Sequence, residues 1–160
     1  MESVIASLSE SLAAISAPRF FESERGFQGE LLVQLNKRLK LSDNTIIEQE
    51  HQKKLKAHGL TIRPDIIIHE PFNPELHEAR TEGNFAAIEL KLNASPETAA
   101  EDFKSLSALL EVLQYPICFF INIGSAKSHC NLVPDSVRGK IVCFAVHVAE
   151  GETVVIQEGT

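Results

Sequence analysis

Two nearly continuous apolar runs in the second half of the chain constrain the fold most strongly. Residues 117–124 read ICFFINIG, and residues 141–148 read IVCFAVHV. Runs of this kind are typical of strands that are covered on both faces, which requires helices on both sides of a sheet. The two runs therefore predict an α/β domain.

Three other segments have the three- and four-residue apolar spacing of amphipathic helices. These are residues 3–16, 27–40 and 96–113. Pro18 limits the first helix, because the residue before a proline avoids the α region. Ser95 is a good N-cap for the third helix. We therefore expect two helices near the N-terminus and one between the strands.

Alternating apolar and polar residues predict three further strands, at residues 45–51, 62–69 and 85–92. The predicted order is helix, helix, three strands, helix and two strands. This order predicts a central mixed sheet of about five strands flanked by helices. We expect a single domain over residues 1–160, with an N-terminal helical extension (1–26), a core (27–148) and a loose tail around residues 157–160.

The charge balance restricts the function classes. The chain has 15 Lys and Arg against 22 Asp and Glu, a net charge of −7. This excludes binding of nucleic acid by bulk positive charge, but not an enzyme that supplies its cations locally or as bound metal. No window approaches the length of about 18 apolar residues that a membrane span needs, so we expect no membrane association.

The cysteines and the N-terminus bear on the compartment. Three cysteines without a CxxC pair favour free thiols and a reducing environment. Glu2 and Glu10 precede the first basic residue, Arg19, whereas a signal peptide begins with positive charge. These observations predict a cytoplasmic protein.

Three charged residues interrupt strands that are otherwise apolar. Glu89 and Lys91 lie two apart on the predicted third strand, so both should project from the same side of the sheet. On the neighbouring strand, Asp65 precedes three isoleucines. Suppose that the two strands form an antiparallel hairpin with His69 opposite Phe85. The same register then places Asp65 opposite Glu89.

Two carboxylates this close repel each other unless a cation lies between them. Asp65 and Glu89 are therefore candidate ligands of Mg²⁺, with Mn²⁺ as a substitute, since such ions take one or two carboxylates together with water and phosphate. Lys91 would lie beside the ion and stabilise charge on a phosphate. Three further glutamates are candidate ligands of the ion or of metal-bound water: Glu30, Glu48 and Glu50.

The segments IRPDIIIHEP (62–71) and GNFAAIELKL (83–92) carry Asp65 after a proline, and then Glu89-Leu90-Lys91. This pattern resembles the bipartite motif of the PD-(D/E)XK nuclease superfamily. The resemblance covers roughly residues 27–148. Within that superfamily the segments are also similar to small bacterial restriction-endonuclease-like proteins of unassigned role.

The resemblance implies a core of one helix, three strands, a second helix and one or two more strands. It implies an endonuclease that hydrolyses DNA phosphodiester bonds with Mg²⁺. Carried over by position, Asp65 and Glu89 would be the metal ligands, Lys91 the catalytic lysine and Glu30 an auxiliary acid.

Other readings of the same residues remain open. The Glu89–Lys91 pair could be a structural ion pair on a partly exposed sheet, with Asp65 a turn residue. The domain could be a catalytically inactive binding or regulatory subunit of a larger DNA-processing complex, or Lys91 could form a Schiff base with a carbonyl substrate. Because the helix after Leu92 should cover one face of the sheet, we expect the charged residues in a cleft on the other face.

DNA is the predicted partner, although an acidic chain binds it poorly without help. A homodimer, or a partner protein that supplies DNA affinity, would compensate. Two basic groups could follow a DNA backbone beside the site, or could simply form solvated surface. They are Lys37, Arg38 and Lys40, and then Lys53, Lys54 and Lys56.

Overall fold

The computed structural model describes residues 2–49, 62–79 and 81–159. Glu50 and the basic group Lys53, Lys54 and Lys56 lie outside these ranges. The described elements, in chain order, are α1 (Glu2–Ala13), η1 (Pro18–Glu22), α2 (Glu24–Arg38), β1 (Ile46–Gln49), β2 (Ile66–His69), β3 (Asn84–Leu92), α4 (Pro96–Val112), β4 (Ile117–Ile123), η2 (Cys130–Leu132), η3 (Asp135–Val137), β5 (Ile141–Ala149) and β6 (Glu152–Glu158).

The described strands form one mixed sheet in the order β1-β2-β3-β4-β5-β6. The first three strands are antiparallel to one another, whereas β3, β4 and β5 run parallel and β6 returns antiparallel. A helix, α4, connects β3 to the parallel strand β4, as a parallel connection requires. The prediction of an α/β domain with a mixed sheet and flanking helices is confirmed.

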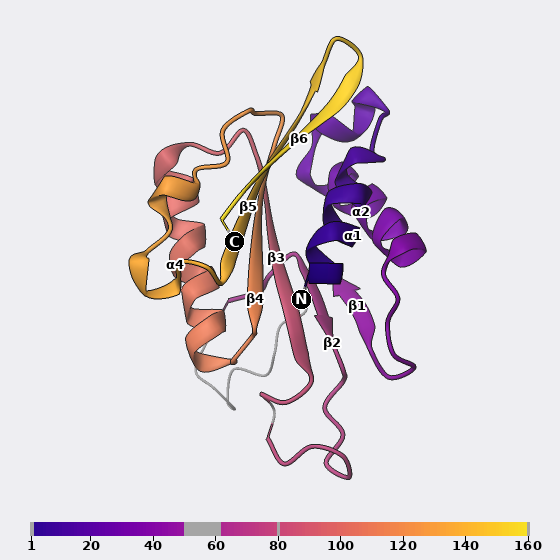
Figure 1. Cartoon of the computed structure of the whole chain (residues 1–160), viewed down its shortest axis with the longest axis vertical. Helices are drawn as coiled ribbons and strands as arrows, with labels where there is room; N and C mark the ends of the chain where they lie inside the picture. Colours follow the sequence, from indigo (N-terminus) through magenta and orange to yellow (C-terminus); the bar gives the residue numbers. More distant parts are fainter. Residues whose placement is uncertain (1, 50–61, 80, 160) are drawn as a thin grey trace.

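The sheet lies between two helical layers (Figure 1). Helices α1 and α2 cover one face, where Ile66, Ile68 and Ile88 join the apolar residues of both helices in one buried cluster. Helix α4 and the short helices η2 and η3 cover the other face, where Ile67 and Ala87 join a second cluster. The alternation of side chains along β2 and β3 therefore divides their residues between the two layers.

The predicted register of the central hairpin holds at three positions and fails at the fourth. Ile66 pairs with Ile88, and the next two residues of β2 continue the same register. A shift between Ile68 and His69 places His69 opposite Asn84, so the predicted pairing with Phe85 is wrong. Such a bulge is a local irregularity that the spacing of apolar residues does not encode. The register at the Asp65 end of the hairpin is unaffected.

The C-terminal prediction also needs correction, because residues 152–158 form a sixth strand where we expected a loose tail around residues 157–160. The strand pairs with β5 from Cys143 opposite Glu158 to Ala149 opposite Glu152. Glu150 and Gly151, both with positive φ, make the two-residue turn between them.

Helix α2 begins three residues before the predicted segment. The Ser23 side chain accepts a hydrogen bond from the Gly26 N–H at 3.1 Å and caps the helix. This earlier start places Glu24 in the first turn, which matters for the site below.

Among the residues that the structure describes, none of the helices combines the length and the apolar character that crossing a bilayer demands.

Candidate active site

Asp65, Glu89 and Lys91 belong to the same face of the sheet, the face that helix α4 covers. Ile67 and Ala87 point into the α4 cluster. Asp65 lies two residues before Ile67, and Glu89 and Lys91 lie two and four residues after Ala87, so alternation places all three on that face. The prediction that the charged residues need a cleft on the face opposite this helix is therefore wrong.

The carboxylate of Asp65 is held by the backbone of β3. Asp65 precedes β2, and its Oδ2 accepts a hydrogen bond from the Leu90 N–H at 2.7 Å. The buried side chain of Gln28, on α2, donates from Nε2 to the Asp65 carbonyl oxygen at 2.7 Å. These two contacts fix Asp65 beside Glu89, although the residues are far apart in the sequence.

Lys91 lies between two carboxylates. Its Nζ is 3.5 Å from Glu89 Oε1 and 3.9 Å from Asp102 Oδ1. The side chains of both acids are 13% exposed, whereas that of Lys91 is 28% exposed. The side chain of Lys91 is therefore the most exposed of the three, while the two acids are largely withdrawn from water.

Burial and crowding raise the pKa of both acids. The pKa of Glu89 rises from its ordinary 4.5 to about 8, first because of burial and then because of the negative charge of Asp65. The pKa of Asp102 rises to about 6, chiefly through burial, and Asp65 and Glu24 add to the effect. Lys91 opposes both shifts but does not cancel them. Three carboxyl groups, those of Asp65, Glu89 and Asp102, therefore share the one ammonium of Lys91 in a site that is largely withdrawn from water.

The pKa of Lys91 is itself raised above its ordinary 10.5. Burial, the largest single effect, would lower it, but the negative charges of Asp102, Glu89, Glu24 and Asp65 together more than offset the burial. Lys91 is consequently a protonated ammonium near neutral pH. This argues against the Schiff-base reading, which needs a neutral amine.

The surplus of carboxylate fits a divalent cation. Mg²⁺ takes one or two protein carboxylates and completes its shell with water and substrate phosphate. Asp65 and Glu89 are the acids best placed to hold it, because the charge of Asp65 already acts on Glu89. Within the described ranges, no three His, Cys, Asp or Glu side chains are arranged as an all-protein metal cage. A site of this composition would leave coordination positions for water and phosphate.

Asp102 is a member of the site that we did not predict from the sequence. It lies on α4 in line with Ala99 and Leu106, on the stripe that packs against the sheet. An aspartate on the buried stripe of a helix is costly unless it has a partner or a function. The charge at a buried helix position was the sequence signal that could have identified Asp102. We did not identify it, because the leucines and the phenylalanine on the same stripe indicate an ordinary apolar helix face.

Within the described part of the chain, the predicted auxiliary acid Glu30 makes no hydrogen bond or ion pair with Lys91. Its Oε1 accepts a hydrogen bond from Gln34 Nε2 on the same helix at 2.5 Å. The acid of α2 whose charge acts on Lys91 and Asp102 is Glu24, and Glu24 Oε2 accepts from the Leu92 N–H at 3.2 Å.

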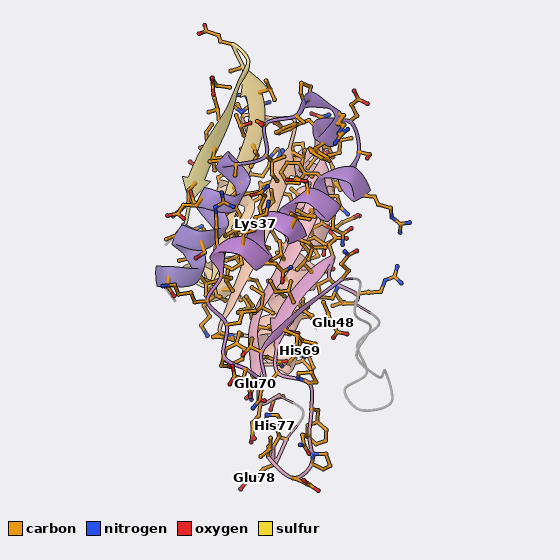
Figure 2. All side chains as sticks on the ribbon, turned by 90° about the vertical axis from the view of Figure 1, so that its right-hand side faces the viewer. Lys37, Glu48, His69, Glu70, His77 and Glu78 are labelled. Atoms are coloured by element: carbon orange, nitrogen blue, oxygen red, sulfur yellow. The ribbon has the colours of Figure 1, made fainter. Side chains whose placement is uncertain are left out.

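Glu48 lies opposite Ile67, the second residue of β2, but its carboxylate is turned to the far end of that strand. Its Oε2 lies 2.6 Å from His69 Nε2, and Figure 2 shows Glu48 and His69 side by side. The carboxylate of Glu48 is therefore directed away from Asp65, which precedes the first residue of β2.

The basic group Lys37, Arg38 and Lys40 belongs to the other layer of the molecule. Lys37 and Arg38 end helix α2, which covers the face opposite α4 (Figures 1 and 2). Arg38 and Lys40 border a cavity of about 500 Å³ between α1, β2 and β3. This group therefore does not lie beside Asp65 and Glu89.

Searches against protein-family models, curated proteins and solved structures find no match to this chain. Its function has to be inferred from the chemistry of the site.

Proposed function

We propose that the chain is a Mg²⁺-dependent endonuclease that hydrolyses DNA phosphodiester bonds, with a fold of the PD-(D/E)XK type. The observation that supports the proposal most directly is the convergence of Asp65, Glu89 and Lys91 on one face of two neighbouring strands. The antiparallel strands β1 to β3, followed by a helix and a parallel strand, agree with the core that the resemblance implies.

The residues of the chain would divide the work as follows. Asp65 and Glu89 hold the metal, and Gln28 and the Leu90 N–H keep Asp65 in place. When bound, Mg²⁺ supplies a Lewis acid that activates water and neutralises charge on the phosphate. The Lys91 ammonium, which is partly exposed, binds a non-bridging phosphate oxygen and stabilises its growing charge.

The reaction joins water to phosphorus and breaks one phosphorus–oxygen bond in line with the attack. The attacking water loses a proton to solvent, and the departing sugar oxygen gains one. Lys91 remains protonated, so its role is electrostatic rather than that of a general base.

Cleavage of supercoiled plasmid in the presence of Mg²⁺ or Mn²⁺ tests the proposal. Asp65→Asn, Glu89→Gln and Lys91→Ala should each lower the rate at least about 100-fold. Lys104→Ala and Glu111→Gln are matched controls, because both residues are exposed on α4, and both variants should cleave at the rate of the unmodified protein. Wild-type cleavage that persists in Asp65→Asn and Lys91→Ala would reject the assignment.

The net charge of −7 favours a second candidate, a nuclease-like subunit that binds or regulates other components and does not cleave DNA itself. Titration calorimetry with Mg²⁺ separates the two candidates. Heat of binding that disappears in Glu89→Gln supports the nuclease, and absence of binding in the wild type favours the subunit.

A further inference from the structure

Asp102 has a geometry that the proposed metal site does not use. Its Oδ1 lies 3.9 Å from Lys91 Nζ. Its Oδ2 is buried and, within the part of the chain that the structure describes, has no hydrogen-bond partner. Asp102 as a whole is 9% exposed. A buried carboxylate oxygen without a hydrogen-bond partner lowers the stability of the folded state, so the presence of an aspartate at this position needs an explanation.

Metal binding would change the surroundings of Lys91. In the structure, Lys91 Nζ is closer to Glu89 Oε1 than to Asp102 Oδ1, at 3.5 Å against 3.9 Å. If Glu89 held a divalent ion, its carboxylate would no longer be available to Lys91, and the ion would repel the ammonium. Lys91 would then need another anion, and among the contacts of the described residues Asp102 is the next carboxylate that it reaches.

We propose that Asp102 is a positioning residue, which holds the Lys91 ammonium at the site once Glu89 is engaged by the metal. This inference rests on the proposed nuclease function. Helix α4 carries Asp102 in its second turn, anchored by the Ser95 N-cap and by the packing of Phe103 against Phe120. The anchor is therefore part of a rigid element, whereas Lys91 has a long and flexible side chain.

The proposal differs from a role for Asp102 as a third metal ligand. Substitution of a metal ligand would lower the metal affinity of the protein, as we expect for Glu89→Gln. A positioning residue would leave the affinity nearly intact and lower the rate of cleavage, because the ammonium would no longer be held near the phosphate.

Three measurements on the full chain test this difference, with Ca²⁺ as a probe that occupies the site. Calorimetry gives the Ca²⁺ affinity, steady-state cleavage with Mg²⁺ gives kcat and KM, and NMR of ¹³C-labelled lysine follows the Lys91 Hε protons, assigned with Lys91→Arg. Asp102→Asn should keep its Ca²⁺ affinity within about threefold and lose about 10- to 100-fold in kcat at unchanged KM. Its two Hε signals should merge when Ca²⁺ is added, whereas they stay distinct in the wild type.

Asp102→Glu restores the charge and should recover part of kcat, and Glu111→Gln is the control for loss of an exposed charge on α4. A loss of Ca²⁺ affinity in Asp102→Asn as large as in Glu89→Gln would make Asp102 a ligand and overturn the proposal. Unchanged kcat and distinct Hε signals in Asp102→Asn would also overturn it. If the wild type binds no Ca²⁺, the proposed nuclease function itself fails, which is a separate and recognisable result.

Discussion

The two faces of strands β2 and β3 have opposite chemistry. On the face that α1 and α2 cover, Ile66, Ile88 and Leu90 are at most 1% exposed and belong to a large apolar cluster. On the face that α4 covers, the same strands and the residue before β2 carry Asp65, Glu89 and Lys91. The first face therefore contributes stability along the whole hairpin, whereas the second combines the buried Ile67 and Ala87 with a concentration of charge that costs stability. Such a division is typical of a functional site on a stable scaffold.

The apolar face should be the more sensitive to loss of side-chain volume. Ile88→Ala removes a fully buried side chain from the centre of β3 and should lower the free energy of unfolding by about 2–5 kcal/mol. Urea denaturation measures the effect. Val33→Ala on α2, where the side chain is 46% exposed, is the control and should change the stability by about 0.5 kcal/mol or less. Equal losses in the two variants would contradict the assignment of the core.

The charged face should respond to pH instead. Because the folded state raises the pKa of Glu89 from 4.5 to about 8, the folded protein holds this proton more tightly than the unfolded chain. The stabilisation is complete below about pH 4.5 and is lost as the pH rises through about 8, over a range of up to a few kcal/mol. Glu89→Gln should therefore be more stable than the wild type at about pH 8 in EDTA and should show a flatter pH profile.

Thermal or urea unfolding at about pH 5 and about pH 8 measures this difference. Glu111→Gln, which removes an exposed acid from helix α4 in the same layer, is the control and should follow the wild-type profile. Addition of Ca²⁺ at about pH 8 should stabilise the wild type and not Glu89→Gln. A Glu89→Gln variant that is less stable than the wild type at about pH 8 would mean that the site is a net stabilising ion pair.

The same contrast explains how much the sequence could predict. Apolar spacing and runs placed the helices and five of the strands, because burial leaves a periodic trace in the sequence. The shared face of Glu89 and Lys91 followed from alternation, and the neighbouring position of Asp65 followed from the register. The face that α4 covers could not be assigned, because no local signal says on which side of a sheet a connecting helix packs.

The residues that the sequence did not identify are those whose role depends on tertiary contact. Asp102 meets Lys91 only because α4 folds back over β3, and Gln28 meets Asp65 only because α2 lies across the other face. Glu24, rather than Glu30, acts on Lys91 because Ser23 starts the helix early. The sixth strand had a local signal, the two-residue Glu150-Gly151 turn before a Val-Val-Ile run, and could have been predicted.

The smallest of the expected effects tests whether the two faces are coupled. Gln28 belongs to the apolar layer, yet its Nε2 donates to the Asp65 carbonyl oxygen at 2.7 Å. Gln28→Ala should lower the free energy of unfolding by only about 1 kcal/mol, the usual contribution of one hydrogen bond. Because Asp65 would be less firmly held, the variant should also bind Ca²⁺ more weakly, by about tenfold on the scale of other residues that position metal ligands.

Calorimetry with Ca²⁺ and urea denaturation measure the two quantities on the same samples. Gln157→Ala is the control, since Gln157 is exposed on β6 and touches neither Asp65 nor α2 in the described contacts. If Ca²⁺ binding is weaker in Gln28→Ala and unchanged in Gln157→Ala, a residue of the α1 and α2 layer helps to position Asp65 on the opposite face of the sheet. If Gln28→Ala loses stability and keeps its full Ca²⁺ affinity, the Gln28 hydrogen bond does not position Asp65 for the ion, and the two faces of the sheet are independent.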